Sequence, residues 1–152
     1  MNRVVCLLAA GGLLGLAAVA GVAPAAPALK DRPAPDPLPG RWAADDMSIA
    51  GRSSPQWLGL EYEFAPGGRW VIYRGGREDP DGPRAFAADA TAAVPAIDLT
   101  EGKETYAGVY RVGPGRDRLT VSLPIARGGG RPAGVEPGRA VMTITFRRVK
   151  AD

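Results

Sequence analysis

The side chains in this chain that could perform chemistry are its carboxylates, because the sequence contains no histidine and a single cysteine, Cys6. A Ser-His-Asp or Cys-His nucleophile is therefore excluded, as is a zinc site built from cysteine and histidine. Two acid pairs, Asp45 with Asp46 and Glu61 with Glu63, are of the kind that a two-carboxylate hydrolase uses. Glu61 and Glu63 alternate with apolar residues, which places them on the solvent side of a strand. We predict no catalytic residue and favour a protein that is not an enzyme, with a carboxylate-based hydrolase as the least favoured alternative.

Two loops have the composition of ligand sites, and each has a simpler interpretation. Residues 78–82 read Glu-Asp-Pro-Asp-Gly, but they lack the ordered ligand series and terminal Glu of a calcium-binding EF-hand, so ordinary turn chemistry accounts for them. Residues 127–131 read Arg-Gly-Gly-Gly-Arg and are suited to hold an anion. No Gly-Lys-Ser/Thr follows them, so we expect a flexible connection between two strands. We predict no metal site and no cofactor.

The first 28 residues have the layout of a secretory signal peptide. A basic Arg3 precedes an uncharged Ala/Leu/Gly/Val run over 4–22, and small-x-small triplets follow at 18–20 and 26–28. The alternative is an uncleaved anchor, because the uncharged stretch is long enough to span a bilayer. We expect cleavage, which removes Cys6 and any disulfide with it. We expect no stable membrane span after cleavage and an exported location: the periplasm, the cell envelope or the outside of the cell.

The rest of the chain divides into a short tether and one domain. Residues 29–39 hold four prolines and little that can be buried, so we predict a Pro/Ala-rich tether there. The domain is expected over residues 40–150. The chain has 19 basic and 16 acidic residues with a net charge of +3, and the two signs are scattered. This balance argues against a nucleic-acid partner.

From residue 40 onwards the dominant period is two. Apolar Leu60, Tyr62 and Phe64 alternate with Glu61 and Glu63, the pattern of a strand with one dry and one wet face. Short Gly/Pro turns separate about eight such segments, and no segment is convincing as a helix. The expected strands are 41–49, 58–64, 69–74, 84–90, 97–100, 106–112, 119–123 and 142–146. The fold class is therefore all-β. Eight antiparallel strands most simply close into an up-and-down barrel, which removes exposed edges, and a β-sandwich is the alternative.

Several short motifs in this order carry a resemblance. They are Leu-Pro-Gly-Arg-Trp at 38–42, Pro-Ala-Ile-Asp-Leu-Thr at 95–100, Gly-Val-Tyr-Arg-Val at 108–112, Asp-Arg-Leu-Thr-Val at 117–121 and Phe-Arg-Arg-Val-Lys at 146–150. Together they resemble a conserved domain of unknown function that recurs in planctomycete bacteria, whose members are often exported and have a lipocalin-like barrel. This chain departs from the family at Ser122, where a Cys is frequent, and at Val135, where an aromatic residue is usual. The resemblance implies the fold and brings no catalytic or ligand residues.

The same resemblance implies a closed end of the barrel. In lipocalins an arginine near the end of the chain covers a tryptophan of the first strand. Here that contact would join Trp42 to Arg147, or to its neighbour Arg148. Such a pair would be structural.

The aromatic residues decide what the interior of the barrel could do. An eight-stranded barrel is only wide enough for packed side chains or one small ligand, and a filled core is the default. If the barrel is hollow, we expect five aromatic side chains to line the pocket: Tyr62, Trp70, Tyr106, Tyr110 and Phe146. The leading hypothesis is an exported, lipocalin-like binding module for a small apolar ligand. The alternative is a structural or protein-partner domain of the cell envelope.

Overall fold

The computed structural model describes residues 36–80 and 82–150, which form an all-β domain. The predicted signal peptide (1–28) and most of the predicted tether (29–39) lie outside the described residues. The strands are β1 (Gly40–Ile49), β2 (Arg52–Ser53), β3 (Leu60–Ala65), β4 (Arg69–Arg74), β5 (Arg77–Glu78), β6 (Arg84–Asp89), β7 (Ala96–Glu101), β8 (Glu104–Val112), β9 (Arg118–Pro124) and β10 (Val141–Arg148). A 3-10 turn at Pro55–Trp57 joins β2 to β3.

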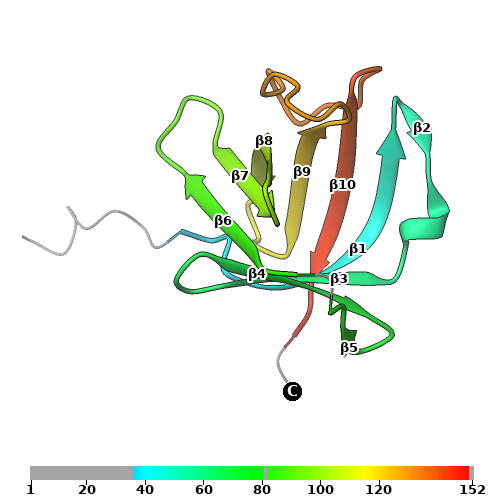
Figure 1. Cartoon of the computed structure of the whole chain (residues 1–152), viewed down its shortest axis with the longest axis vertical. Coiled ribbons are helices and arrows are strands. Elements are labelled where there is room, and N and C mark those ends of the chain that lie inside the picture. The colour runs from blue at the N-terminus through cyan, green and yellow to red at the C-terminus, as the bar shows by residue number, and fades with distance from the viewer. Residues whose placement is uncertain (1–35, 81, 151–152) are drawn as a thin grey trace, which may run out of the picture. The chain divides into compact units, whose positions relative to one another are not determined.

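Eight of these strands close into an antiparallel barrel, as the alternation predicts, and the β-sandwich alternative is wrong. The order around the barrel is β10-β9-β8-β7-β6-β4-β3-β1, and β1 pairs back onto β10. Figure 1 shows β10 lying between β9 and β1. The two-residue strands β2 and β5 pair with the last residues of β1 and β4 and form short hairpins there. Closure leaves the eight main strands with a partner on both sides, which an open sheet does not achieve.

The strands β4 and β6 have the fewest paired residues of any neighbours in the barrel wall. These strands share one register pair, Arg69 with Ala85, and one nearby bond in which the Phe86 amide donates to the Gly68 carbonyl at 2.6 Å. Beyond that point β4 pairs with β5 instead. In contrast, β1 and β10 stay paired from Trp42 opposite Arg148 to Ile49 opposite Met142.

A bulge in β1 changes which residues of that strand face inwards. The pairing with β10 shifts between Ala44 and Asp46. Trp42 and Ala44 are buried before the bulge and Met47 after it, so the inward positions pass from even to odd numbers. A bulge adds one unpaired residue and bends the strand. Here it allows β1 to keep an apolar side chain on the core along most of its length.

The acids on β3 lie on the outer face of the barrel, as the alternation predicts. Glu61 accepts a hydrogen bond from Arg41 at 2.6 Å, and Glu63 accepts one from the Tyr73 hydroxyl at 2.8 Å. The Arg41 guanidinium also stacks over the Tyr73 ring at 3.9 Å. Asp45 pairs with Arg118 on the same outer side of the molecule. These acids therefore take part in surface networks rather than in a shared interior site.

One end of the barrel is closed by Trp42 and the residues around it. Trp42 and Leu38 are fully buried, and the Trp42 indole donates to the Leu38 carbonyl at 2.9 Å. The Arg148 guanidinium lies 4.0 Å from the centre of the Trp42 ring and donates to the carbonyls of Pro37 and Pro39. This is the closure implied by the resemblance, but its arginine is Arg148 and not Arg147. Arg148 is directly opposite Trp42 and shares its face, whereas Arg147 is the next residue and points outwards.

The end of the predicted tether belongs to the barrel. Residues up to 39 were expected to bury little, yet Leu38 is a core residue. Asp36 stabilises this turn, because its carboxylate accepts from the Leu38 amide at 3.0 Å and from the Tyr110 hydroxyl at 3.4 Å. The expectation of a tether is therefore wrong for residues 36–39, because Leu38 is buried in the core and bonds to the Trp42 indole.

The long connection between β9 and β10 is attached to the barrel wall rather than flexible. Arg131 donates to the Asp98 carboxylate at 2.7 Å and to the carbonyls of Ile97 and Gly108. Val135 is buried, and its carbonyl accepts from the Ser122 hydroxyl at 3.1 Å. Arg127 likewise pairs with Glu104, so both arginines of residues 127–131 already have carboxylate partners, which leaves little for a bound anion.

An apolar cavity inside the barrel

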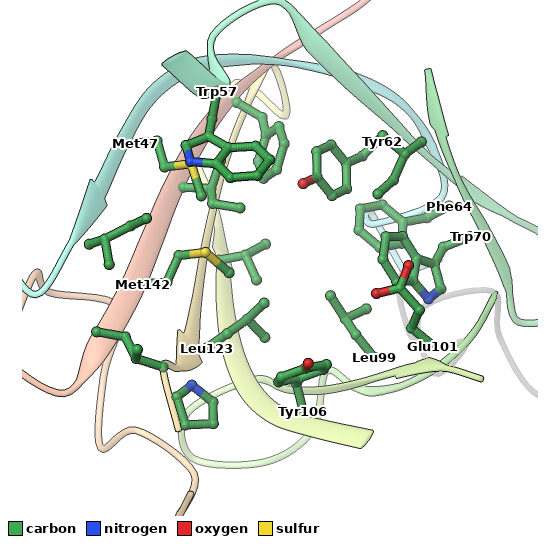
Figure 2. Close-up of a pocket in the computed structure, with 17 residues that line it drawn as sticks. Met47, Trp57, Tyr62, Phe64, Trp70, Leu99, Glu101, Tyr106, Leu123 and Met142 are labelled. Atoms are coloured by element: carbon green, nitrogen blue, oxygen red, sulfur yellow. The ribbon is translucent and has the colours of Figure 1, made fainter. Parts of the chain in front are cut away.

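The barrel is hollow towards the end opposite Trp42. A cavity of about 350 Å³ lies between the walls, and most of its lining is aliphatic, aromatic or sulfur-bearing (Figure 2). The lining residues are Met47, Ile49, Trp57, Tyr62, Phe64, Trp70, Ile72, Leu99, Glu101, Tyr106, Val121, Leu123, Pro124, Ile125, Met142, Ile144 and Phe146. The default expectation of a filled core is therefore wrong. The volume lies near the lower end of the range found for small-molecule sites.

Period-two alternation explains why these side chains meet. Seven of the barrel's strands contribute inward positions, such as Tyr62 and Phe64 on β3, Trp70 and Ile72 on β4, and Ile144 on β10. Successive side chains of a strand point to opposite faces, so every second residue reaches the interior. The strand β6 contributes no lining residue; its Phe86 ring packs edge-on against Phe64, with 5.2 Å between ring centres.

Three aromatic rings form one wall of the cavity. Tyr62 stacks on Trp70 with 5.9 Å between ring centres and 3° between planes, and Phe146 meets Tyr62 edge-on at 5.0 Å. The Trp70 indole donates to the Thr100 carbonyl at 3.2 Å, which fixes the orientation of that ring. Aromatic pairs in these geometries stabilise each other by about 0.5–1.5 kcal/mol beyond burial. The wall is therefore preorganised rather than adaptable.

The Tyr62 hydroxyl is the polar group that reaches furthest into this cavity. Figure 2 shows it pointing towards the middle of the space, and it makes no hydrogen bond to any described residue. Burial, with a contribution from the Glu101 charge, raises the pKa of Tyr62 to about 12. Tyr62 as a whole is half-buried, and its hydroxyl is open to the cavity. Tyr62 is therefore placed to hydrogen-bond something held in the cavity.

Glu101 places a carboxylate in the same cavity. Its Oε1 accepts from Arg84 Nε at 2.8 Å, and no described residue donates to its Oε2. The Arg84 side chain is almost completely buried, lies 5.5 Å from the Trp70 ring centre and donates to the Asp79 carbonyl. Arg84 itself does not line the cavity. Glu101 therefore reaches the cavity surface, while Arg84, on the same face of the sheet and opposite Glu101 in register, is covered by the neighbouring side chains.

The mouth of the cavity has exposed apolar side chains. Trp57 is 37% exposed and Ile125 is 42% exposed, although both line the cavity. Trp57 projects from the 3-10 turn, which is attached to β1 through the Ser54 amide and the Met47 carbonyl at 2.8 Å. Figure 2 places its indole ring over one side of the opening. Apolar side chains at this rim give an apolar molecule a route inwards.

The predicted lining is correct at four of its five positions. Tyr62, Trp70, Tyr106 and Phe146 all line the cavity. Tyr110 is buried but does not line the cavity. It lies four residues further along β8, about 13 Å from Tyr106, at the packed end of the barrel. Its hydroxyl faces Asp36 instead.

Two of the lining residues outside the predicted list bear most on a ligand: Glu101, which adds a charge, and Trp57, at the rim. Glu101 follows Ile97 and Leu99 in period two, so the same count that found those core residues also points Glu101 inwards. Trp57 lies outside any strand, in the 3-10 turn Pro55–Trp57, so strand alternation does not assign it a side.

Alkaline pH tests the burial of the interior tyrosines. Burial raises the pKa of both Tyr62 and Tyr110 to about 12, against an ordinary value of 10.0. In the unfolded chain they lose their protons near pH 10, so the folded state binds more protons above that pH. Their stabilising contribution is therefore complete below about pH 10 and is lost as the pH rises to about 12, by about 1.4 kcal/mol per pH unit for each tyrosine.

Urea unfolding measured at several pH values above 9 checks this. Tyr62→Phe should flatten the decline in the free energy of unfolding relative to the unchanged protein. An identical pH dependence in the two proteins would contradict the buried, neutral state of Tyr62.

Metal and membrane features do not add to the site. Within residues 36–80 and 82–150, no three acidic, cysteine or histidine side chains gather as they would around a metal ion. Over the same residues, no helix is long and apolar enough to cross a membrane.

Comparison with known proteins finds no matching family model, no similar curated protein and no similar solved structure. The geometry of the cavity is therefore the basis for assigning a function.

Proposed function

We propose that this protein binds a small, largely apolar molecule inside its barrel. The observation that carries the proposal is the cavity itself, about 350 Å³ and lined by apolar and aromatic side chains with one unpartnered hydroxyl, that of Tyr62. Protein interiors are normally packed with few voids larger than a water molecule. An apolar void costs stability, and a ligand that fills it recovers those contacts.

The composition of the lining favours binding over catalysis. Among the described residues that line the cavity, Glu101 is the one carboxylate. A two-carboxylate hydrolase needs a second acid facing the first across the substrate. The other acids weighed in the sequence, such as Asp45 and Glu61, are paired with arginines on the outer face.

A protein-partner role is the second candidate, and the mouth of the barrel supports it. Trp57, Leu58 and Ile125 are each more than one-third exposed. Exposed aromatic residues are frequent anchors at protein interfaces. In this role the barrel would be a scaffold, and the partner an envelope protein that covers the rim.

We further propose that the chain is exported and belongs with the planctomycete-type barrel domains that it resembles. The support for export is the layout of residues 1–28, and the support for the family is the order of motifs from 38 to 150. Amino-terminal sequencing of the protein recovered from its native cells would test the first point, with cleavage expected near residue 28.

A fluorescent apolar probe tests ligand binding directly. Purified protein is titrated with N-phenylnaphthylamine, which is uncharged at neutral pH and brightens in apolar surroundings. We expect saturable fluorescence and an increase in the unfolding temperature with probe concentration, because a ligand that binds only the folded state stabilises it. A rise in fluorescence without saturation, together with an unchanged unfolding temperature, would contradict a binding cavity. Capture of an envelope protein without probe binding would favour the second candidate.

A further inference from the structure

The polar groups of the cavity define which end group a ligand needs. Two of them have bonding capacity left: the Glu101 carboxylate, through Oε2, and the Tyr62 hydroxyl. Tyr106 also lines the cavity, but its hydroxyl donates to Glu104 at 3.0 Å. Figure 2 shows both groups at the surface of the space, with the Glu101 carboxylate beside Trp70 and the Tyr62 hydroxyl pointing away from it towards the middle.

The charged group that reaches the cavity surface is a hydrogen-bond acceptor. No lysine or arginine is among the described lining residues, and the Arg84 guanidinium, which pairs with Glu101 at Oε1, leaves Oε2 without a donor among the described residues. A carboxylate ligand would place a second negative charge beside this oxygen of Glu101, whose side chain is 43% exposed. A ligand that donates hydrogen bonds and carries positive charge would meet an acceptor.

The aromatic wall beside Glu101 also favours a positively charged ligand. Tyr62 and Trp70 are stacked within this wall, and the Arg84 cation already lies near the Trp70 ring. Aromatic faces attract cations, and cages of aromatic rings with a nearby carboxylate are suited to ammonium groups. The Glu101 carboxylate thus lies beside the Trp70 ring in an otherwise apolar space.

We propose that the ligand is an apolar amine: a hydrocarbon or aromatic body that fills the cavity and a protonated amino group that donates to Glu101 Oε2. This inference rests on the proposed function and narrows it to one ligand class. It excludes fatty acids and other apolar carboxylates as preferred ligands.

Three ligands with the same chain and different end groups test the inference. Octylamine, octanol and octanoate compete against bound N-phenylnaphthylamine at neutral pH. We expect octylamine to bind at least about tenfold more tightly than octanoate, with octanol between them, since a hydrogen bond to a charged group is worth about one order of magnitude in affinity.

The variant Glu101→Gln removes the negative charge while keeping the size of the cavity, so it tests the contribution of the charge alone. It should weaken octylamine about tenfold and leave octanol within about twofold, because only the amine uses the negative charge. Glu78→Gln is the matched control: it removes the charge of another arginine-paired glutamate, on β5 and outside the cavity lining, and should change neither affinity. Unchanged octanol binding also shows that the variant still folds.

The possible failures of the two proposals differ. If octanoate binds as well as octylamine, or if Glu101→Gln leaves octylamine unchanged, the amine is wrong while the binding cavity stands. If neither the probe nor any of the three ligands binds, the proposed function itself is wrong and the amine falls with it.

Discussion

Replacing Trp42 with alanine is expected to lower the free energy of unfolding by about 3–5 kcal/mol, the largest effect of any single change in this domain. Trp42 is fully buried at the closed end, where its indole bonds to the Leu38 carbonyl and lies under the Arg148 guanidinium. The change removes a large apolar volume, one hydrogen bond and one cation–π contact together. Urea unfolding followed by circular dichroism measures it.

Two further variants keep this prediction open to refutation if Trp42→Ala does not fold. Trp42→Phe retains most of the ring and should cost less, while still losing the indole N–H bond to Leu38. Trp57→Ala removes the same type of side chain from the exposed rim and should change stability by less than about 1 kcal/mol. Equal losses from Trp42→Ala and Trp57→Ala would show that the closed end is not the core of the barrel.

Filling the cavity is expected to abolish probe binding. Leu99 and Met142 project into the space from opposite walls, as Figure 2 shows, so Leu99→Trp with Met142→Trp places two indoles where a ligand would lie. The filled protein should also gain about 0.5–2 kcal/mol of stability, because cavity filling supplies the missing contacts. Loss of binding together with a higher unfolding temperature separates a blocked site from a damaged fold. Probe titration and thermal unfolding measure the two effects.

The control for this pair carries a tryptophan on the outside of the same barrel. Tyr73→Trp lies on the outer face of β4, where Tyr73 contacts Arg41 and Glu63, and it should leave probe affinity unchanged. Full probe binding by the filled variant would place the probe elsewhere, for example on the exposed apolar rim.

The two ends of the barrel thus have different physical tasks. Around Trp42 the interior is packed solid and is sealed by Leu38 and Arg148. Around Tyr62 the interior is open and lacks packing contacts, so the closed end must supply more of the free energy of folding. A protein whose binding site is a void needs such a division, since the void itself is destabilising.

Much of the fold could be predicted from the chain, because side-chain alternation is a local property. The apolar period of two located six of the barrel strands, and the segments 41–49 and 84–90 were added to complete eight. The same count assigned Tyr62 and Trp70 to the interior and Glu61 to the outside. Closure into a barrel followed from the need to pair strand edges. These inferences use only neighbouring residues and the geometry of a pleated strand.

The errors came where distance along the barrel or pairing across it mattered. Tyr106 and Tyr110 share a face of β8, and only the position of the plug under Trp42 puts one in the cavity and the other in the packed end. Arg147 and Arg148 differ by one residue, and the cross-strand register decides that Arg148 covers Trp42.

The sequence by itself determined that this chain has no histidine and no cysteine beyond residue 6, that it is all-β, and which faces of its strands are apolar. Only the tertiary structure decided that the barrel is hollow and that Glu101 and Trp57 belong to its lining. Whether inward side chains fill a barrel depends on its radius and on how side chains from distant strands interdigitate. Both depend on contacts between residues that are far apart in the sequence, and local periodicity carries no information about those contacts.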